Sequence, residues 1–97
     1  MNENQAQQLA DLLKALGEYN RLSLVYKLCQ CDLPQNAMCL CDCCNVDASV
    51  VSRHLKILAQ QDIVSFKKSG REIQYSLNRS EVANKLRQLA DIIENPP

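Results

Sequence analysis

The hydrophobic period of this chain changes once, near residue 63, and the change restricts the folds that the chain can adopt. Before that point apolar side chains recur every three or four residues, which is typical of helices that bury one face. Beyond it, Ile63–Phe66 and Ile73–Leu77 alternate like strands, and Lys67–Arg71 between them contains Gly70, a residue suited to a tight turn. The sequence therefore predicts a mainly helical fold that carries one small β-hairpin.

The ends of the helices follow from capping residues. Gly17 is a natural stop for the first helix, and Asn45 tolerates the left-handed backbone of a tight turn between two helices. Asp47 is a good N-cap, and Asn78 with Glu81 three residues later has the pattern of a capping box. The predicted order is α-α-α-α-β-β-α, with helices over residues 5–16, about 20–30, 38–44, about 48–60 and 80–94.

Length and terminal sequences indicate one small domain, residues 1–97. A domain of 97 residues buries a modest core, so a second copy is a natural further source of stability. No apolar run approaches the roughly 18 residues of a membrane span, and residues 1–8 are polar, so we expect a cytoplasmic protein. Apolar residues at both ends exceed the needs of one core and predict a homodimer held by the terminal helices; they are Leu9, Leu12, Leu13, Leu16, Leu86, Leu89 and Ile93.

Basic residues are concentrated in one part of a chain whose formal net charge is zero. Residues 48–79 carry six basic and two acidic side chains, whereas residues 1–47 carry three basic and six acidic ones. A basic segment on a neutral chain is typical of a local phosphate-binding surface, although a solvated polar face has the same composition. The charge pattern favours a nucleic acid as partner without requiring one.

The middle of the chain has the pattern of a helix-turn-helix, in which a short helix, a turn at residues 45–46 and a second helix follow one another. Its inward positions are all apolar or cysteine: Leu40, Cys44, Val46, Val51 and Leu55. A recognition helix needs short hydrogen-bonding side chains and basic ones on its outer face. The second helix presents such a set, Ser49, Ser52, Arg53 and Lys56.

The hairpin that follows would be the wing of a winged helix-turn-helix. Its basic residues Lys67, Lys68 and Arg71 are placed to meet phosphates of the flanking DNA backbone. His54, the only histidine, is a further candidate on the second helix, where it either packs under the turn or approaches the DNA.

Four stretches of the chain resemble the ArsR/SmtB family of metal-responsive winged helix-turn-helix repressors. Residues 52–58 (SRHLKIL), Ile63-Val64 and residues 70–75 (GREIQY) are similar to the family's recognition helix and wing. Residues 9–28, which include Ala15-Leu16-Gly17, are similar to its first two helices. The resemblance implies a homodimer joined by the first and last helices, a palindromic operator in double-stranded DNA, and release by an inducer.

All six cysteines lie between residues 29 and 44. Such crowding closes no useful loops, so thiolate chemistry in a reducing compartment explains it better than a disulfide framework. An all-thiolate site selects soft ions, namely trivalent arsenic or antimony, mercury, cadmium, lead or monovalent copper. The densest part of the segment supplies the predicted ligands, Cys39, Cys41, Cys43 and Cys44.

The choice among these ligands stays open. Cys39, Cys41 and Cys44 match the C-x-C-x-x-C signature that the family's arsenic sensors carry. When this recognition helix is aligned without a gap on that of the arsenic sensors, the cysteine run lies three residues closer to the helix than it does in them. In this alignment Cys41 alone falls on a ligand position of the family. At about 100° per residue a regular helix directs Cys39 and Cys43 to one face and Cys41 and Cys44 to another. Either the first turn unwinds, or Cys39 and Cys43 bind on an intact helix with a third thiolate from Cys29 or Cys31.

These observations predict a DNA-binding transcriptional repressor that a thiophilic metal or metalloid, arsenite or antimonite first, releases from its operator. The alternative is a repressor of the same fold controlled by oxidation or persulfidation of its cysteines. An enzyme is not expected, because a nucleophilic thiol needs a base and the one histidine lies on the recognition helix. A metal-storage module would account for the cysteines but not for the wing.

Overall fold

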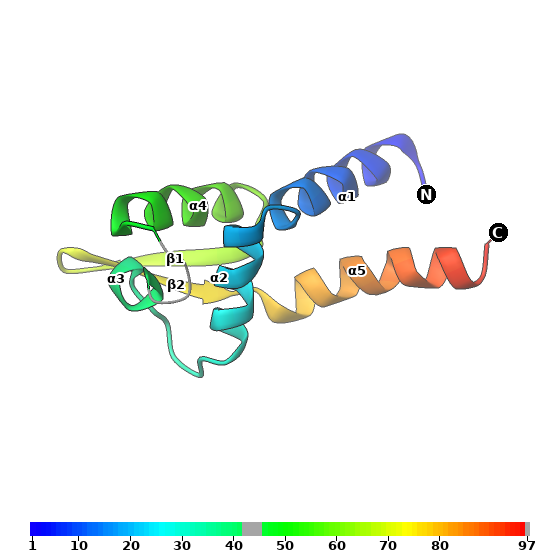
Figure 1. Cartoon of the computed structure of the whole chain (residues 1–97). Coiled ribbons are helices and arrows are strands. Elements are labelled where there is room, and N and C mark those ends of the chain that lie inside the picture. The colour runs from blue at the N-terminus through cyan, green and yellow to red at the C-terminus, as the bar shows by residue number, and fades with distance from the viewer. Residues whose placement is uncertain (42–45, 97) are drawn as a thin grey trace.

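The computed structural model describes residues 1–41 and 46–96, which fold in the predicted order of elements (Figure 1). The structure is a mainly helical winged helix-turn-helix in which a two-stranded hairpin follows the fourth helix. The elements are α1 (Glu3–Leu16), α2 (Tyr19–Cys29), α3 (Ala37–Leu40), α4 (Ala48–Gln60), β1 (Val64–Ser69), β2 (Glu72–Leu77) and α5 (Arg79–Glu94).

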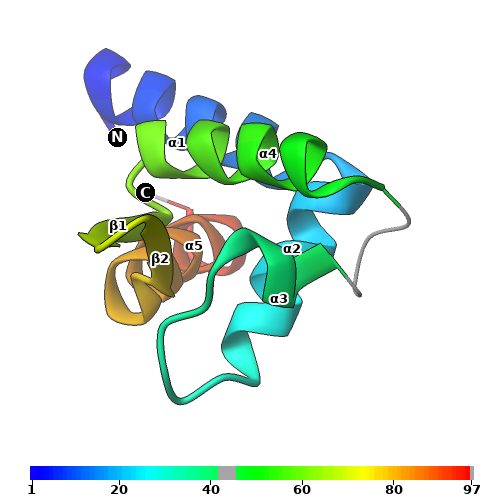
Figure 2. The ribbon, with the colours of Figure 1, turned by 90° about the vertical axis from the view of Figure 1, so that its left-hand side faces the viewer.

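Leucines at helical spacing hold the helices together. In α4 the fully buried residues are Val51, Leu55 and Leu58, spaced four and three residues apart, so one stripe of the helix faces the core. Leu40 of α3 and Leu24 of α2 are also completely buried. Each buried Leu side chain contributes about 1.5–3 kcal/mol by leaving water. Figure 2 shows α4 above α3 and α2, which places the opposite face of α4 on the outside.

Side chains satisfy the backbone groups at the ends of the first two helices. Asn2 and Gln5 form a reciprocal capping box at the start of α1, and the Glu18 carboxylate accepts from the Arg21 backbone at the start of α2. Gly17 is the C-cap of α1, as predicted. The Arg21 guanidinium donates to the carbonyls of Ala15 (2.6 Å) and Lys14 (3.4 Å), so α2 covers the end of α1.

The two predicted N-caps farther along the chain differ from expectation. Asp47 precedes α4, as predicted, but its side chain makes no capping hydrogen bond. The predicted capping box of Asn78 and Glu81 is wrong, because the Asn78 side chain makes no capping bond either. Instead it donates to the Asp62 carbonyl at 2.7 Å and accepts from the Ser65 hydroxyl at 2.8 Å. Asn78 is therefore engaged in closing the base of the hairpin, where Asp62 adopts a positive φ of 58°.

The hairpin is longer than the sequence pattern predicted. Lys67 and Lys68 belong to strand β1 rather than to the turn, which is reduced to Gly70 and Arg71 between the paired residues Ser69 and Glu72. Gly70 has φ +64°, a conformation that costs glycine little, and this allows the tight reversal. A backbone bridge between Gln35 and Tyr75, with N···O distances of 3.0 and 2.8 Å, attaches β2 to the segment before α3.

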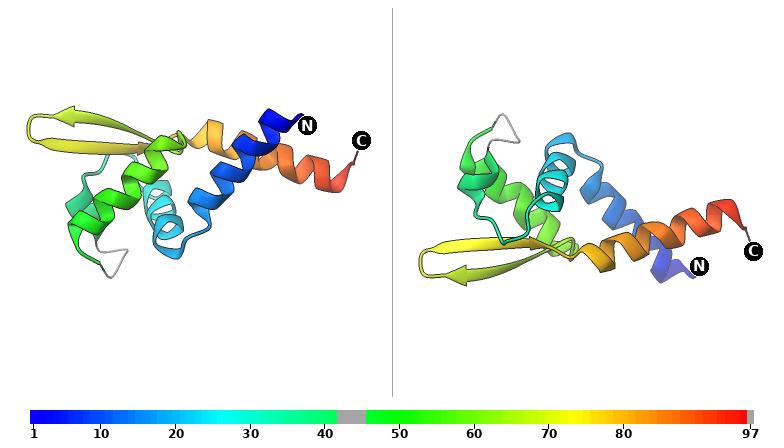
Figure 3. Two further views of the ribbon diagram at one scale, coloured as in Figure 1. Left: turned by 90° about the horizontal axis from the view of Figure 1, so that it is seen from above. Right: turned by 90° about the horizontal axis from the view of Figure 1, so that it is seen from below.

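The first and last helices project away from the wing. In Figure 3 the chain termini lie at the end opposite to the hairpin tip, and the molecule measures 48 × 25 × 23 Å. Along the described part of α5, Val82 alone is buried, and Leu86 and Ile93 are exposed. No helix in the described ranges has both the length and the apolar character needed to cross a membrane.

Candidate nucleic-acid interface and thiol sites

The outer face of α4 carries the polar residues predicted to read DNA. Ser49, Arg53 and Lys56 are exposed and Ser52 is half-buried. Their spacing of three and four residues places the four side chains on one side of the helix, opposite to the stripe that faces the core. This face is thus free for hydrogen bonding to an external partner.

His54 lies on another side of α4. Its side chain is 15% exposed, and its Nδ1 atom lies 3.4 Å from Nη1 of Arg21 and 3.9 Å from Oε2 of Glu18. A guanidinium has donors and no acceptor, so Arg21 is the donor in this contact and Nδ1 of His54 the acceptor. The ring thereby joins α4 to the start of α2.

The basic residues of the wing, Lys67, Lys68 and Arg71, are all exposed. Their side chains divide between the two faces of the hairpin. Lys68 pairs with Ile73 and therefore shares a face with Phe66 and Tyr75, whereas Lys67 pairs with Gln74 on the other face. The outer end of the wing thus carries a lysine on each face, and the exposed carboxylate of Glu72 lies on the face of Lys67.

A groove of about 570 Å³ separates α4 from the wing. Four residues of α4 form one wall, and three residues of the hairpin form the other; they are Ser52, Lys56, Ala59, Gln60, Phe66, Ile73 and Tyr75. Burial raises the pKa of the Tyr75 hydroxyl, which keeps this wall uncharged. The sequence pattern did not indicate that Phe66 and Ile73 lie at the surface, because alternating apolar residues in a strand normally indicate a buried face.

Two of the four predicted ligands lie in the described residues. Cys39 is exposed on α3, where its backbone N–H donates to the Asn36 side chain at 2.9 Å. Cys41 follows the helix, is half-buried, and donates its thiol to the Ala37 carbonyl at 3.3 Å. Cys43 and Cys44 lie outside the described residues. Within residues 1–41 and 46–96 no three Cys, His, Asp or Glu side chains are grouped closely enough to hold a metal ion.

The other two cysteines lie at the end of α2. Cys29 is exposed, Cys31 is half-buried, and neither forms a disulfide. Arg79, the first residue of α5, donates to the carbonyls of Leu28, Cys29 and Cys31 at 3.1, 3.1 and 2.9 Å. One guanidinium therefore links the thiol-bearing end of α2 to the last helix. No sequence signal indicated this role for Arg79, because its acceptors lie about fifty residues earlier in the chain.

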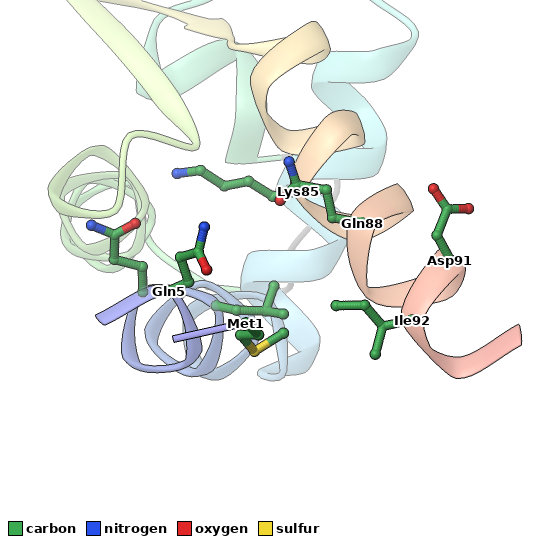
Figure 4. Close-up of a pocket in the computed structure, with 8 residues that line it drawn as sticks. Met1, Gln5, Lys85, Gln88, Asp91 and Ile92 are labelled. Carbon is green, nitrogen blue, oxygen red and sulfur yellow. The ribbon is translucent and has the colours of Figure 1, made fainter. Parts of the chain in front are cut away.

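A cavity of about 400 Å³ lies between α1 and α5 (Figure 4). Gln5 and Leu9 line it from α1, and Lys85, Gln88 and Ile92 line it from α5. Leu12 and Leu16, predicted to help join two copies, are instead buried in the core of this chain. Leu13 of α1 and Leu86 and Ile93 of α5 stay exposed. The terminal helices thus retain apolar surface that the described part of one chain does not cover.

Comparison with known proteins agrees with this architecture. Residues 19–65, from the start of α2 into β1, match the model of the bacterial regulatory protein arsR family. The chain is 36% identical over 97 residues to a transcriptional repressor SmtB homolog from Synechocystis, covering 97% of this chain and 70% of the relative. It is 36% identical over 72 residues to the arsenical resistance operon repressor of Bacillus subtilis, covering 71% of this chain and 65% of that protein.

A solved structure shows the same fold. The ArsR-like transcriptional regulator from Rhodococcus superimposes with a TM-score of 0.76 at 27% identity, over 92% of this chain and 82% of that one. The similarity extends beyond the helix-turn-helix to the terminal helices, because so much of both chains is covered.

Proposed function

Because the chain belongs to the ArsR family of bacterial transcriptional regulators, we propose that it is a repressor that binds operator DNA as a homodimer and is released by a soft metal or metalloid. One domain comprising residues 1–97 would carry all three functions. The observation that carries the proposal is the pairing of the polar outer face of α4 with a wing that is cationic at its tip.

In this proposal α4 is the recognition helix. Arg53 reaches guanine edges in the major groove, and Ser49, Ser52 and Lys56 add contacts to bases or phosphates. Lys67, Lys68 and Arg71 of the wing contact backbone phosphates and set the position of the protein on the duplex. His54 is assigned to orienting α4, because its ring contacts Arg21 and Glu18 inside the chain.

The homodimer would use the surface that α1 and α5 leave uncovered. Leu13, Leu86 and Ile93 are exposed, and Ile93 is 70% exposed, which is costly for an apolar residue in a lone chain. A two-fold axis between these helices would present two copies of α4 to a palindromic operator, which explains how one short helix gains specificity.

The inducer site would use the thiolates at α3. Thiolates without an imidazole partner suit trivalent arsenic or antimony, or mercury, cadmium, lead or monovalent copper, so the donor chemistry fits a soft ion. Cys39 and Cys41 supply two sulfurs, and further ones come from Cys43 and Cys44 or from the end of α2. Since α3 packs directly on α4, drawing these sulfurs together would shift the recognition helix. A coupling of about 1–3 kcal/mol is enough to change operator occupancy markedly.

A thiol redox switch is the second candidate. The four cysteines in the described ranges are free, and Cys29 and Cys39 are exposed, so an oxidant or persulfide donor has access to them. Modification of α3 would disturb α4 by the same contact. Release by an oxidant but not by any soft ion would favour this candidate.

The test is a fluorescence anisotropy titration with a duplex enriched from a random-sequence library by the wild-type protein. Wild type should bind, and arsenite, antimonite, mercury or cadmium should release it. Cys39→Ser and Cys41→Ser should bind the duplex normally and lose the response, whereas Cys29→Ser should retain more of it. A normal response in both α3 variants would contradict the proposed inducer site.

A further inference from the structure

Two large apolar side chains of the wing are exposed on one face. The exposed fractions are 65% for Phe66 and 42% for Ile73. Phe66 pairs with Tyr75, and Ile73 pairs with Lys68, so all four side chains share the face that is turned towards α4. The Phe66 ring lies 6.5 Å from the Tyr75 ring, centroid to centroid, at a tilt of 49°, which fixes its position over the groove.

The groove lies between the two elements assigned to DNA. Figure 3 shows that α4 and the hairpin converge at the connection between them and diverge towards the wing tip. Ser52 and Lys56 line the groove on the side of α4, and both belong to the proposed recognition face. A duplex that contacts α4 and the wing together must therefore pass across the groove.

The chemistry of the groove matches a sugar–phosphate strand. Among the described residues its lining includes one cationic side chain, Lys56, and no carboxylate, and Lys68 lies beside Ile73 on the same face of the hairpin. Positive groups at the edges suit phosphates, whereas the apolar wall formed by the hairpin suits the deoxyribose rings between them. Phosphate contacts alone would leave Phe66 and Ile73 facing water.

We propose, on the basis of the DNA-binding function above, that this groove holds the deoxyribose rings of one DNA strand and that Phe66 and Ile73 contact them directly. Sugars are the same in every sequence, so these contacts raise the affinity for all duplexes. They release no counterions, so they contribute affinity that does not depend on salt.

The experiment measures the affinities of variants for the enriched duplex and for a scrambled duplex over a range of salt concentrations. Phe66→Ala should weaken binding to both about tenfold, which corresponds to about 1.4 kcal/mol, with an unchanged slope of log K against log salt. Ile73→Ala should act in the same direction, and Phe66→Leu should retain most of the affinity. Tyr26→Ala is the matched control, because Tyr26 is equally exposed, at 67%, on α2.

Several results would overturn the inference. If Phe66→Ala binds the duplexes with unchanged affinity while Arg53→Ala binds them more weakly, the groove is not part of the DNA interface, and the proposed function still holds. If the wild-type protein binds no duplex, both this inference and the proposed function are contradicted. A flatter salt slope in Phe66→Ala means that the ring acts by positioning lysines, and altered sedimentation means that the face joins two copies. If Phe66→Ala lowers the Tm, Phe66→Gln, which replaces the ring by a smaller polar side chain, is measured in the same titrations. A similar loss for both duplexes at an unchanged salt slope supports the inference, and unchanged affinity overturns it.

Discussion

Replacing Arg79 by alanine should lower the free energy of unfolding by about 2–2.5 kcal/mol. The guanidinium donates to three carbonyls at the end of α2, where carbonyls lack intrahelical partners, and the Leu28 carbonyl also accepts from the Cys31 N–H at 3.1 Å. It also places a positive charge at the negative end of the helix dipole. The substitution removes both effects and separates α5 from α2.

The magnitude follows from which carbonyls water can reach. Three hydrogen bonds from a charged donor would sum to about 5–9 kcal/mol at about 1.5–3 kcal/mol each. The bonds to Cys29 and Cys31 are exposed, so water replaces the guanidinium there, and the bond to Leu28 is part-buried. The Leu28 carbonyl keeps its bond from the Cys31 N–H, so the lost bond counts at the lower end, about 1.5 kcal/mol, and a dipole contribution of about 0.3–1 kcal/mol adds to it. For a domain of this size the loss corresponds to a fall in Tm of roughly 10–20 °C.

The assay is urea unfolding followed by circular dichroism, at one fixed protein concentration because self-association would shift the midpoint. Arg87→Ala is the control, since Arg87 on the same helix bonds only to Asn84 among the described residues and is exposed. It should change stability by less than about 0.5 kcal/mol. Arg79→Lys should be intermediate, because an ammonium group cannot reproduce the planar guanidinium fork. Equal midpoints for Arg79→Ala and Arg87→Ala would refute the reasoning.

Three further outcomes are expected. Arg53→Ala should cost about 1–3 kcal/mol of operator affinity, and unchanged operator affinity would exclude α4 as the recognition helix. Lys67→Ala should weaken binding to all DNA and reduce the slope of log K against log salt by about one. Wild type should sediment as a dimer at micromolar concentration and Leu86→Glu as a monomer, and a folded wild-type monomer would contradict the proposed interface. The pKa of Glu18 is lowered from 4.5, chiefly by the Arg21 backbone hydrogen bond, so its stabilising contribution is complete above pH 4.5 and is lost as the pH falls through the lowered value. Glu18→Gln should remove that part of the dependence of the urea midpoint on acidic pH. Identical midpoints of wild type and variant at every pH would refute this role of Glu18.

The sequence alone identified the order of the elements, the hairpin and the outer face of α4. These features depend on local periodicity, and residues such as Val51 and Leu55 must share one face once the segment is helical. It also identified Gly70 as the turn residue, because φ +64° suits glycine in whatever fold surrounds it. The clustering of the cysteines was visible in the same way, since it is a property of adjacent residues.

Contacts between distant residues were decided only by the tertiary structure. Asn78 has the local pattern of a capping residue, yet Asp62 and Ser65 lie within reach in the folded chain and take its side chain. Phe66 has the pattern of a core residue, but α4 covers the hairpin near its base and leaves the outer part of that face open. Arg79 could have bonded anywhere that its long side chain reaches. A local pattern specifies which groups need partners, and the packing of the elements specifies which partners are near enough.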